Sequence, residues 1–184
     1  MNLILLGMPG SGKGTVASWL QEKYLYRQIS TGDLLREERK VGTQLGKQVE
    51  VIMNEGKLVS DEMIIELVKK HIKTVGFKGV VFDGFPRTVF QAKSLDETTN
   101  IDQVIFLKVS EKIVVDRLLN RSDDSGQRRE DDNERVIKER IKVYMENTQP
   151  LIDHYEKKCL LTTLDGGVSI ENVRNKVKEV IESL

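Results

Sequence analysis

The stretch Leu3-Ile4-Leu5-Leu6-Gly7-Met8-Pro9-Gly10-Ser11-Gly12-Lys13-Gly14-Thr15 decides the fold of this chain. An apolar run comes first, a glycine-rich turn follows, and a helical pattern begins at Gly14. Glycines let the backbone turn sharply and bring its N–H groups close to anionic oxygens, and the start of a helix favours negative charge. With Lys13 as a mobile positive charge, the stretch predicts a strand, a phosphate-binding loop and a helix that bind a nucleoside triphosphate. The strict motif has Ser or Thr directly after the lysine, whereas Gly14 precedes Thr15 here.

Short apolar runs alternate with helical patterns along the 184 residues. This alternation predicts one α/β domain over residues 1–184, with a five-stranded parallel sheet covered by helices on both faces. Together with the phosphate-binding loop, it indicates a P-loop NTPase fold. The expected strands are Asn2–Leu6, a weaker one at Gln28-Ile29, Gly79–Phe82, Gln103–Val109 and Leu160–Leu164. The expected helices are Gly14–Tyr24, Asp61–Ile72, Glu111–Leu119, a long one from Asn133 to Tyr155 bent near Pro150, and one that Ser169 caps.

Two segments interrupt the alternation of strands and helices. Residues 30–59 are mostly helical in pattern and polar, which predicts a small helical insert. Residues 122–128 are polar and contain a glycine, which is typical of a short exposed loop.

The composition narrows the classes of function. Lys plus Arg and Asp plus Glu both number 29, so we expect no bulk electrostatic binding to nucleic acid or to a membrane surface. The single cysteine, Cys159, cannot form an internal disulfide, and the sequence has no Cys/His cluster for zinc. His71 and His154 lie far apart, and we expect structural or exposed roles for both. Because no apolar run nears the ~20 residues that span a bilayer and no signal-peptide pattern is seen, a cytoplasmic location is expected.

A second chemical signal is Asp83, which ends the apolar run Val80-Val81-Phe82. In a doubly wound sheet the carboxyl ends of the strands line the ligand crevice. An acid there, beside a phosphate loop, can hold Mg²⁺ directly or through water. The alternative role for Asp83 is that of a helix cap.

A third signal is a set of arginines in or beside predicted loops and helix ends. The planar guanidinium fork can grip a phosphate through two hydrogen bonds, although a solvated surface charge is the alternative for any single arginine. The set consists of Arg36, Arg87, Arg117, Arg121, Arg128, Arg129 and Arg140.

Four stretches together resemble the adenylate kinases of the nucleoside monophosphate kinase family, over nearly the whole chain. In that family a glycine follows the loop lysine, as Gly14 does here. The four stretches are Gly7–Thr15, Ile29–Arg36, Asp83–Thr88 with Gln91, and Arg129–Asn133.

The resemblance implies a role for each matching residue in the reaction ATP + AMP ⇌ 2 ADP. It implies Mg²⁺ as the cofactor of ATP, held by Asp83 and Thr15 through water. Residues for ATP would be Gly10, Ser11, Gly12, Lys13, Gly14, Thr15, Arg117, Arg121, Gly167 and Val168. Residues for AMP would be Thr31, Arg36, Met53, Lys57, Val59, Gly84, Arg87, Gln91, Arg129 and Arg140. Catalysis would depend on Lys13, Arg87, Arg121, Arg129 and Arg140.

The resemblance also implies an AMP-binding insert at residues 30–59 and a short lid at residues 121–131. The lid is too short for a small sheet and lacks the cysteines of the zinc-binding lid, so no structural zinc is expected. Between Arg128 and Arg129, the spacing to Asp131-Asp132 favours Arg129 as the arginine that bridges the nucleotides. A monomer is the family-level expectation.

Two alternative functions remain. A UMP/CMP kinase shares the fold and the short lid, but Thr31 would then be expected to be alanine, and Gln91 also argues against it. A catalytically silent nucleotide-binding regulator would not need the full set of arginines.

Overall fold

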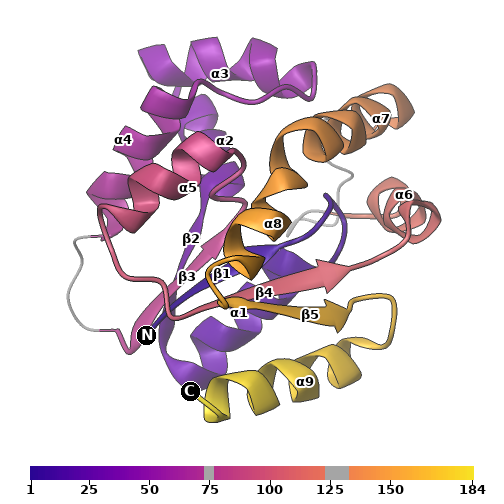
Figure 1. The fold of residues 1–184 in the computed structure, drawn as a ribbon. Coiled ribbons are helices and arrows are strands. Elements are labelled where there is room, and N and C mark those ends of the chain that lie inside the picture. The colour runs from indigo at the N-terminus through magenta and orange to yellow at the C-terminus, as the bar shows by residue number, and fades with distance from the viewer. Residues whose placement is uncertain (73–76, 123–132) are drawn as a thin grey trace.

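The computed structural model describes residues 1–72, 77–122 and 133–184. Within these residues, five parallel strands form one sheet in the order β2-β3-β1-β4-β5 (Figure 1). The strands are Asn2–Leu6 (β1), Tyr26–Ser30 (β2), Gly79–Asp83 (β3), Gln103–Lys108 (β4) and Leu161–Asp165 (β5). The predicted five-stranded parallel sheet is confirmed, and β2 is longer than the two residues expected.

The central strand β1 is buried on both faces, which explains its unbroken apolar sequence. Ile4 pairs with Phe82 of β3 on one side and with Val104 of β4 on the other. Because successive side chains of a strand point to opposite faces, β1 contributes to two separate cores. Ile4 and Leu6 belong to one core, and Leu3 and Leu5 belong to the other.

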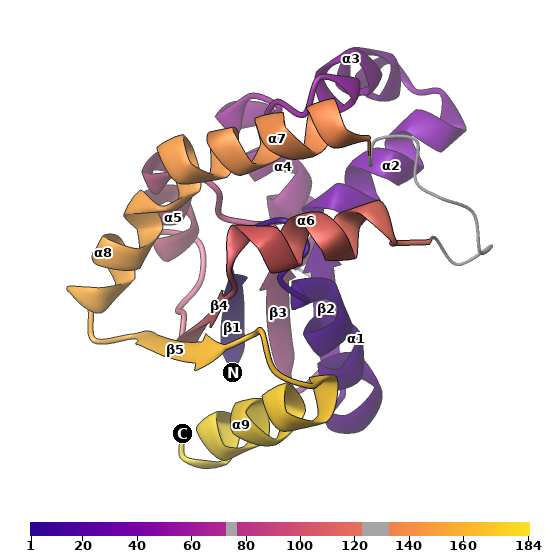
Figure 2. The same cartoon turned by 90° about the vertical axis from the view of Figure 1, so that its right-hand side faces the viewer.

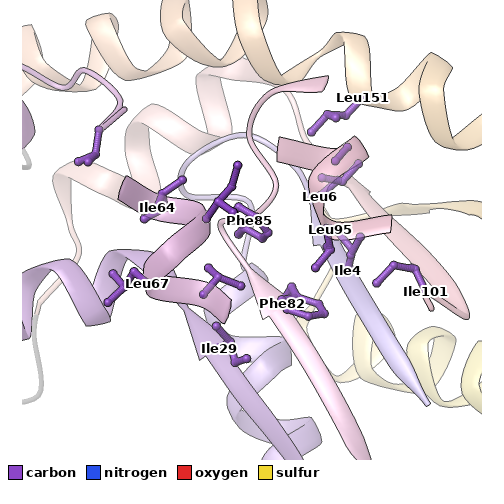
Figure 3. Close-up of a cluster of buried hydrophobic side chains, with 14 of the residues drawn as sticks. Ile4, Leu6, Ile29, Ile64, Leu67, Phe82, Phe85, Leu95, Ile101 and Leu151 are labelled. Atoms are coloured by element: carbon purple, nitrogen blue, oxygen red, sulfur yellow. The ribbon is translucent and has the colours of Figure 1, made fainter. Parts of the chain in front are cut away.

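Helices cover both faces of the sheet. The helices within the described residues are Lys13–Tyr24 (α1), Thr31–Val41 (α2), Gln44–Asn54 (α3), Asp61–Ile72 (α4), Val89–Asp96 (α5), Glu111–Leu119 (α6), Glu134–Val143 (α7), Pro150–Glu156 (α8) and Ile170–Glu182 (α9). Figures 1 and 2 show α1 and α9 together on one face and α5 and α8 on the opposite face. Figure 3 shows the core beneath α4 and α5, where Phe82 and Phe85 are fully buried. Burying a side chain of this size contributes roughly 1.5–3 kcal/mol to folding.

The predicted helices are confirmed with two corrections. The long helix expected from Asn133 to Tyr155 is wrong, because the π-helix Tyr144–Thr148 (η1) separates α7 from α8. Pro150 is the first residue of α8, where its fixed φ and missing N–H are tolerated. The short helix α5 was not predicted. The cap of α9 is confirmed, because Ser169 Oγ accepts a hydrogen bond from the backbone N–H of Asn172 at 3.3 Å.

The segment predicted as a helical insert contains α2 and α3, which pack directly on each other. A Cβ atom at Gly46 of α3 would lie 2.1 Å from the carbonyl oxygen of Glu38 in α2, so only glycine permits this approach. The segment is less polar inside than its sequence suggested, because Leu35, Val49 and Met53 are buried in the core that α4 and α5 cover.

Candidate nucleotide site

The phosphate loop connects β1 to α1 at the carboxyl edge of the sheet. Gly7, Gly10 and Gly12 all have positive φ. A Cβ atom at Gly10 would lie 2.8 Å from Leu118 Cγ, so helix α6 packs against the loop. Gly12 is the N-cap of α1 with φ +99°, and here the conformation itself requires glycine, since a Cβ atom at this position would meet no other atom within 4 Å. The loop therefore places the N-terminus of α1 at the carboxyl edge of the sheet, where it can bind an anion.

Lys13 folds back over this loop. Its Nζ donates hydrogen bonds to the carbonyl oxygens of Gly7 at 2.7 Å and Met8 at 2.9 Å. Burial lowers the pKa of the Lys13 ammonium from 10.5 to about 8. The negative charge of Asp83 opposes this fall in the pKa, and the positive charge of Arg87 adds to it. The ammonium is thus poised beside the loop in a poorly solvated environment.

Asp83 lies at the end of β3, opposite Ser30 at the end of β2. Gln28 Nε2 donates to Asp83 Oδ2 at 3.4 Å. Burial raises the pKa of the Asp83 carboxyl, whereas the charge of Lys13 lowers it. A Cβ atom at Gly14 would lie 3.4 Å from Asp83 Oδ2, so Gly14 keeps space free beside the carboxylate.

The residues around Asp83 fit Mg²⁺ that arrives with a nucleotide. No group of three or more His, Cys, Asp or Glu side chains able to hold a metal occurs in residues 1–72, 77–122 and 133–184. Magnesium in phosphate-transfer sites typically uses one or two carboxylates, with substrate phosphates and water as its other ligands. Asp83 and the hydroxyl of Thr15, which both line the cavity described next, match that requirement.

One continuous cavity of about 940 Å³ joins the phosphate loop to the α2–α3 segment. Its volume lies near the upper end of the range usual for ligand sites. All predicted site residues that the structure describes line the cavity, with the exception of Gly167. Those lining residues are Gly10, Ser11, Gly12, Lys13, Gly14, Thr15, Thr31, Arg36, Met53, Lys57, Val59, Asp83, Gly84, Arg87, Gln91, Arg117, Arg121, Arg140 and Val168.

Gly167 is the predicted site residue that, among the described residues, does not line the cavity. The backbone N–H of Gly167 donates to Asp165 Oδ1 at 2.8 Å, and its neighbours Gly166 and Val168 line the cavity instead. Arg129, like Arg128, lies outside the described residues, as does most of the predicted lid.

Gly84 is the point on which the side chains at the α2 end of the cavity converge. Its carbonyl oxygen accepts from Thr31 Oγ1 at 2.8 Å and from Arg87 Nε at 2.7 Å. Its φ is +74°, and a Cβ atom would lie 3.0 Å from Arg87 Nη2 and 3.1 Å from Thr31 Oγ1. A side chain at this position would therefore displace both partners.

Positive charge gathers in the middle of the cavity. Burial lowers the pKa of the Arg87 guanidinium, and the charges of Arg140 and Arg36 lower it further. Asp83 opposes these effects and raises the pKa of Arg87. Arg36 also forms an ion pair with Asp33 in the first turn of α2. Such a cluster of guanidinium groups suits the phosphates of a bound nucleotide.

The side chain of Gln91 is buried and fixed by two hydrogen bonds, which the sequence did not predict. It is 2% exposed, its Oε1 accepts from the backbone N–H of Arg87 at 2.7 Å, and its Nε2 donates to Asp61 Oδ1 at 2.7 Å. One lone pair and one N–H of the amide stay available for a ligand.

Sequence reasoning missed two groups that support the site. Asp61 begins α4, and no local motif relates it to Gln91. Thr148 lies in η1, and its Oγ1 donates to the carbonyl oxygen of Arg87 at 2.9 Å. A buried threonine within a helical apolar pattern is the one signal that could have found the second group.

Comparison with known proteins identifies the family. A family model for adenylate kinase matches residues 5–160. An adenylate kinase from Prochlorococcus marinus is 42% identical over 184 aligned residues, which cover 97% of this chain and 97% of that protein. One from Archaeoglobus fulgidus is 41% identical over 215 aligned residues, with coverage of 100% and 99%. One from Porphyromonas gingivalis is 39% identical over 188 residues, with coverage of 99% and 96%.

The resemblance that the four sequence stretches indicated is therefore confirmed along the chain, and the fold agrees with it. The chain belongs to the adenylate kinase family of enzymes, which carry out reversible phosphoryl transfer between ATP and AMP.

Proposed function

We propose that this protein transfers the γ-phosphoryl group of Mg-ATP to AMP, giving two ADP, and that the described cavity holds both nucleotides at once. The observation that carries this proposal is the continuity of the cavity from the phosphate loop to the α2–α3 segment. A site for one nucleotide would need only the first half of that space.

The ATP half is built on the start of α1. The backbone from Gly10 to Thr15 holds the phosphates, and Lys13 exchanges its bonds to Gly7 and Met8 for bonds to phosphate oxygens. Arg117 of α6 and Arg121, just after this helix, approach the phosphates, and Val168, with backbone near Gly167, lies at the adenine.

The AMP half is built on α2, α3 and the turn after β3. Thr31, Arg36 and Arg87 receive the AMP phosphate, and Gln91 reads the base with its remaining donor and acceptor. The walls are completed by Met53, Lys57, Val59 and Gly84.

Catalysis in this proposal comes from alignment and from stabilisation of charge. The nucleophile is an oxygen of the AMP phosphate, which is already ionised at pH 7, so no general base is required. Lys13, Arg87 and Arg121, together with Arg129 and Arg140, neutralise the charge on the transferring phosphoryl group. Residues 30–59 and a short lid at 121–131 close over the nucleotides and exclude water, which would otherwise accept the phosphoryl group.

Asp83 and Thr15 would hold the Mg²⁺ that arrives with ATP, through water, and the ion would supply further positive charge to the phosphates. Burial raises the pKa of the Asp83 carboxyl, and a cation bound beside it would favour the ionised form, as the charge of Lys13 already does. No zinc is assigned to the lid.

We further propose that the protein acts as a monomer in the cytoplasm, on small nucleotides rather than on nucleic acid or membranes. The zero net charge of the chain supports a preference for small nucleotides over nucleic acid and membranes. In the described part of the chain, no helix has the length and apolar character needed to cross a bilayer.

An acceptor-preference assay tests the proposal. Purified protein is given Mg-ATP with AMP, CMP, UMP or GMP in turn, and diphosphate products are quantified. We expect AMP to be the preferred acceptor by a wide margin, and the Lys13→Met protein serves as the control for contaminating kinases. Preference for CMP or UMP would overturn the substrate assignment, and tight ATP binding without any transfer would indicate a regulator.

A further inference from the structure

Asp61 accepts hydrogen bonds from two side chains at the AMP end of the cavity. Its Oδ1 accepts from Gln91 Nε2 at 2.7 Å, and its Oδ2 accepts from Thr88 Oγ1 at 3.0 Å. Asp61 is the first residue of α4, and it is itself outside the cavity lining. It therefore acts on the site through Gln91 and Thr88 rather than by contact with a nucleotide.

The bond to Asp61 fixes the orientation of the Gln91 amide. An ionised carboxylate can only accept hydrogen bonds, and a backbone N–H can only donate. Asp61 thus selects the NH₂ end of the amide, while the N–H of Arg87 selects its oxygen at 2.7 Å. Turning the amide by 180° would set two donors against each other at Arg87 and two acceptors against each other at Asp61.

The same chain of bonds reaches the backbone of Arg87. Its N–H is held by Gln91, its carbonyl oxygen accepts from Thr148 Oγ1, and its side-chain Nε donates to Gly84 O. Arg87 is therefore clamped on three sides before any ligand binds. Asp61 supports this clamp from the side of α4.

A fixed amide also discriminates between purines. Adenine has an amino donor at position 6 beside a ring-nitrogen acceptor, whereas guanine has an oxo acceptor at position 6 beside an N–H donor. An amide held in one orientation matches one of these patterns and opposes the other. An amide free to turn can match both.

We propose that Asp61 is a positioning residue that locks the Gln91 amide and the Arg87 main chain, and so favours AMP over GMP. The discrimination rests on the proposed function, whereas the locking of Arg87 stands independently of it. Asp61 lies outside the four sequence stretches that carry the family resemblance.

The test compares Asp61→Ala with Glu62→Ala. Glu62 is exposed in the same first turn of α4, so its removal takes the same charge from the same helix end. For Asp61→Ala we expect kcat/KM for AMP to fall roughly tenfold to hundredfold, as for loss of a charged hydrogen-bond partner. The KM for ATP should stay within about twofold, and the ratio of kcat/KM for AMP to that for GMP should fall. Glu62→Ala should match the wild type in all three quantities.

Hydrogen exchange gives a readout that does not require activity. In Asp61→Ala the amide of Arg87 should exchange at least about tenfold faster. The amide of Val104 in β4, which donates to the carbonyl oxygen of Leu160 just before β5, should keep its wild-type rate. Equal acceleration at both positions would mean that Asp61 only stabilises the fold and would overturn the inference, as would an unchanged AMP-to-GMP ratio.

Two further results separate the proposals. If the wild type fails to phosphorylate AMP, the proposed function fails, and the exchange of Arg87 still decides the positioning role. If Asp61→Ala folds poorly, Asp61→Asn keeps the shape and one acceptor oxygen. It should keep an AMP-to-GMP ratio near the wild type's, because its Oδ1 can still accept from Gln91 Nε2. A ratio that falls while the amide of Arg87 keeps its wild-type exchange rate would count against the inference.

Discussion

The Lys13 side chain lies within the phosphate loop. Its ammonium replaces solvent with the carbonyl oxygens of Gly7 and Met8, and burial brings its pKa down to about 8. An arriving triphosphate offers full negative charges instead of carbonyl dipoles. Binding therefore relieves a charge that the folded protein solvates poorly.

The lowered pKa of Lys13 predicts a pH-dependent stability. The folded state releases this proton near pH 8, whereas the unfolded chain holds it to about pH 10.5. The unfolded state binds more protons in this window, so the contribution of Lys13 to the free energy of unfolding rises with pH and is lost as pH falls toward 8. The difference in free energy of unfolding, wild type minus Lys13→Met, should therefore increase between pH 7.5 and 9.5 in urea titrations.

The exposed residue Lys23 on the same helix provides the control for this titration. Lys23→Met should keep a constant difference from the wild type over the same range. A wild-type minus Lys13→Met difference that is flat or falls with pH would contradict the burial of the Lys13 ammonium.

Activity gives a separate prediction for Arg87. Arg87→Ala removes a guanidinium that is fixed to Gly84 and lies among the charges of Arg36 and Arg140, so kcat should fall by orders of magnitude. Arg87→Lys should recover little, because an ammonium lacks the planar fork. Steady-state rates at saturating ATP measure this, with circular dichroism to verify the fold. Near-normal turnover in Arg87→Ala would remove Arg87 from the proposed mechanism.

At the scale of elements, strong periodicity and clear end signals decided what the sequence could predict. Asp61–Ile72 and Glu111–Leu119 were predicted with the bounds that the structure has. Helix α5 was missed because it has eight residues and buries only part of one face. The π-helix η1, in which Tyr144 and Thr148 are buried, was missed because its residues continue the helical pattern of α7 without a break signal in the sequence.

The same limit applies to the site. Local motifs predicted roles for Lys13, Asp83 and Arg87, because each lies within a short stretch with its own chemical meaning, and all three line the cavity. The partnership of Gln91 with Asp61 spans thirty residues and depends on how α4 packs against α5, so no single-sequence pattern contains it.

Two buried hydroxyls in η1 give a matched pair of predictions. Thr148 Oγ1 donates to Arg87 O, whereas the hydroxyl of Tyr144 has no hydrogen-bond partner among the described residues. Thr148→Val should lower the free energy of unfolding by about 1–3 kcal/mol, since it leaves a carbonyl unpaired. Tyr144→Phe removes an unpaired polar group, so stability should stay equal or rise. Urea unfolding of both variants checks this, and a loss in Tyr144→Phe as large as in Thr148→Val would contradict the difference between them.

At the scale of the whole molecule, the cavity lies between parts that belong to different cores. Val16 at the start of α1 packs in the core shared with α9, whereas Leu35 and Met53 pack in the core that α4 and α5 cover. Helices α6 and α7 form a third cluster through Val114, Leu118 and Ile137. Nucleotides that contact all three hydrophobic clusters should therefore link the stabilities of these clusters to one another.

This coupling predicts how ligands add to stability. Any ligand that binds only the folded state stabilises it, by about 2.7 kcal/mol at a concentration of 100 times its Kd. An ATP analogue with a methylene bridge between the β- and γ-phosphates prevents turnover, so it can be combined with AMP. Because the cavity holds both nucleotides in the proposed function, the analogue and AMP together should raise the free energy of unfolding by at least the sum of their separate increments. In Arg87→Ala the AMP increment should shrink while that of the analogue persists. A combined increment no larger than the greater single one would mean that the two nucleotides compete for one site, and the bisubstrate cavity would have to be abandoned.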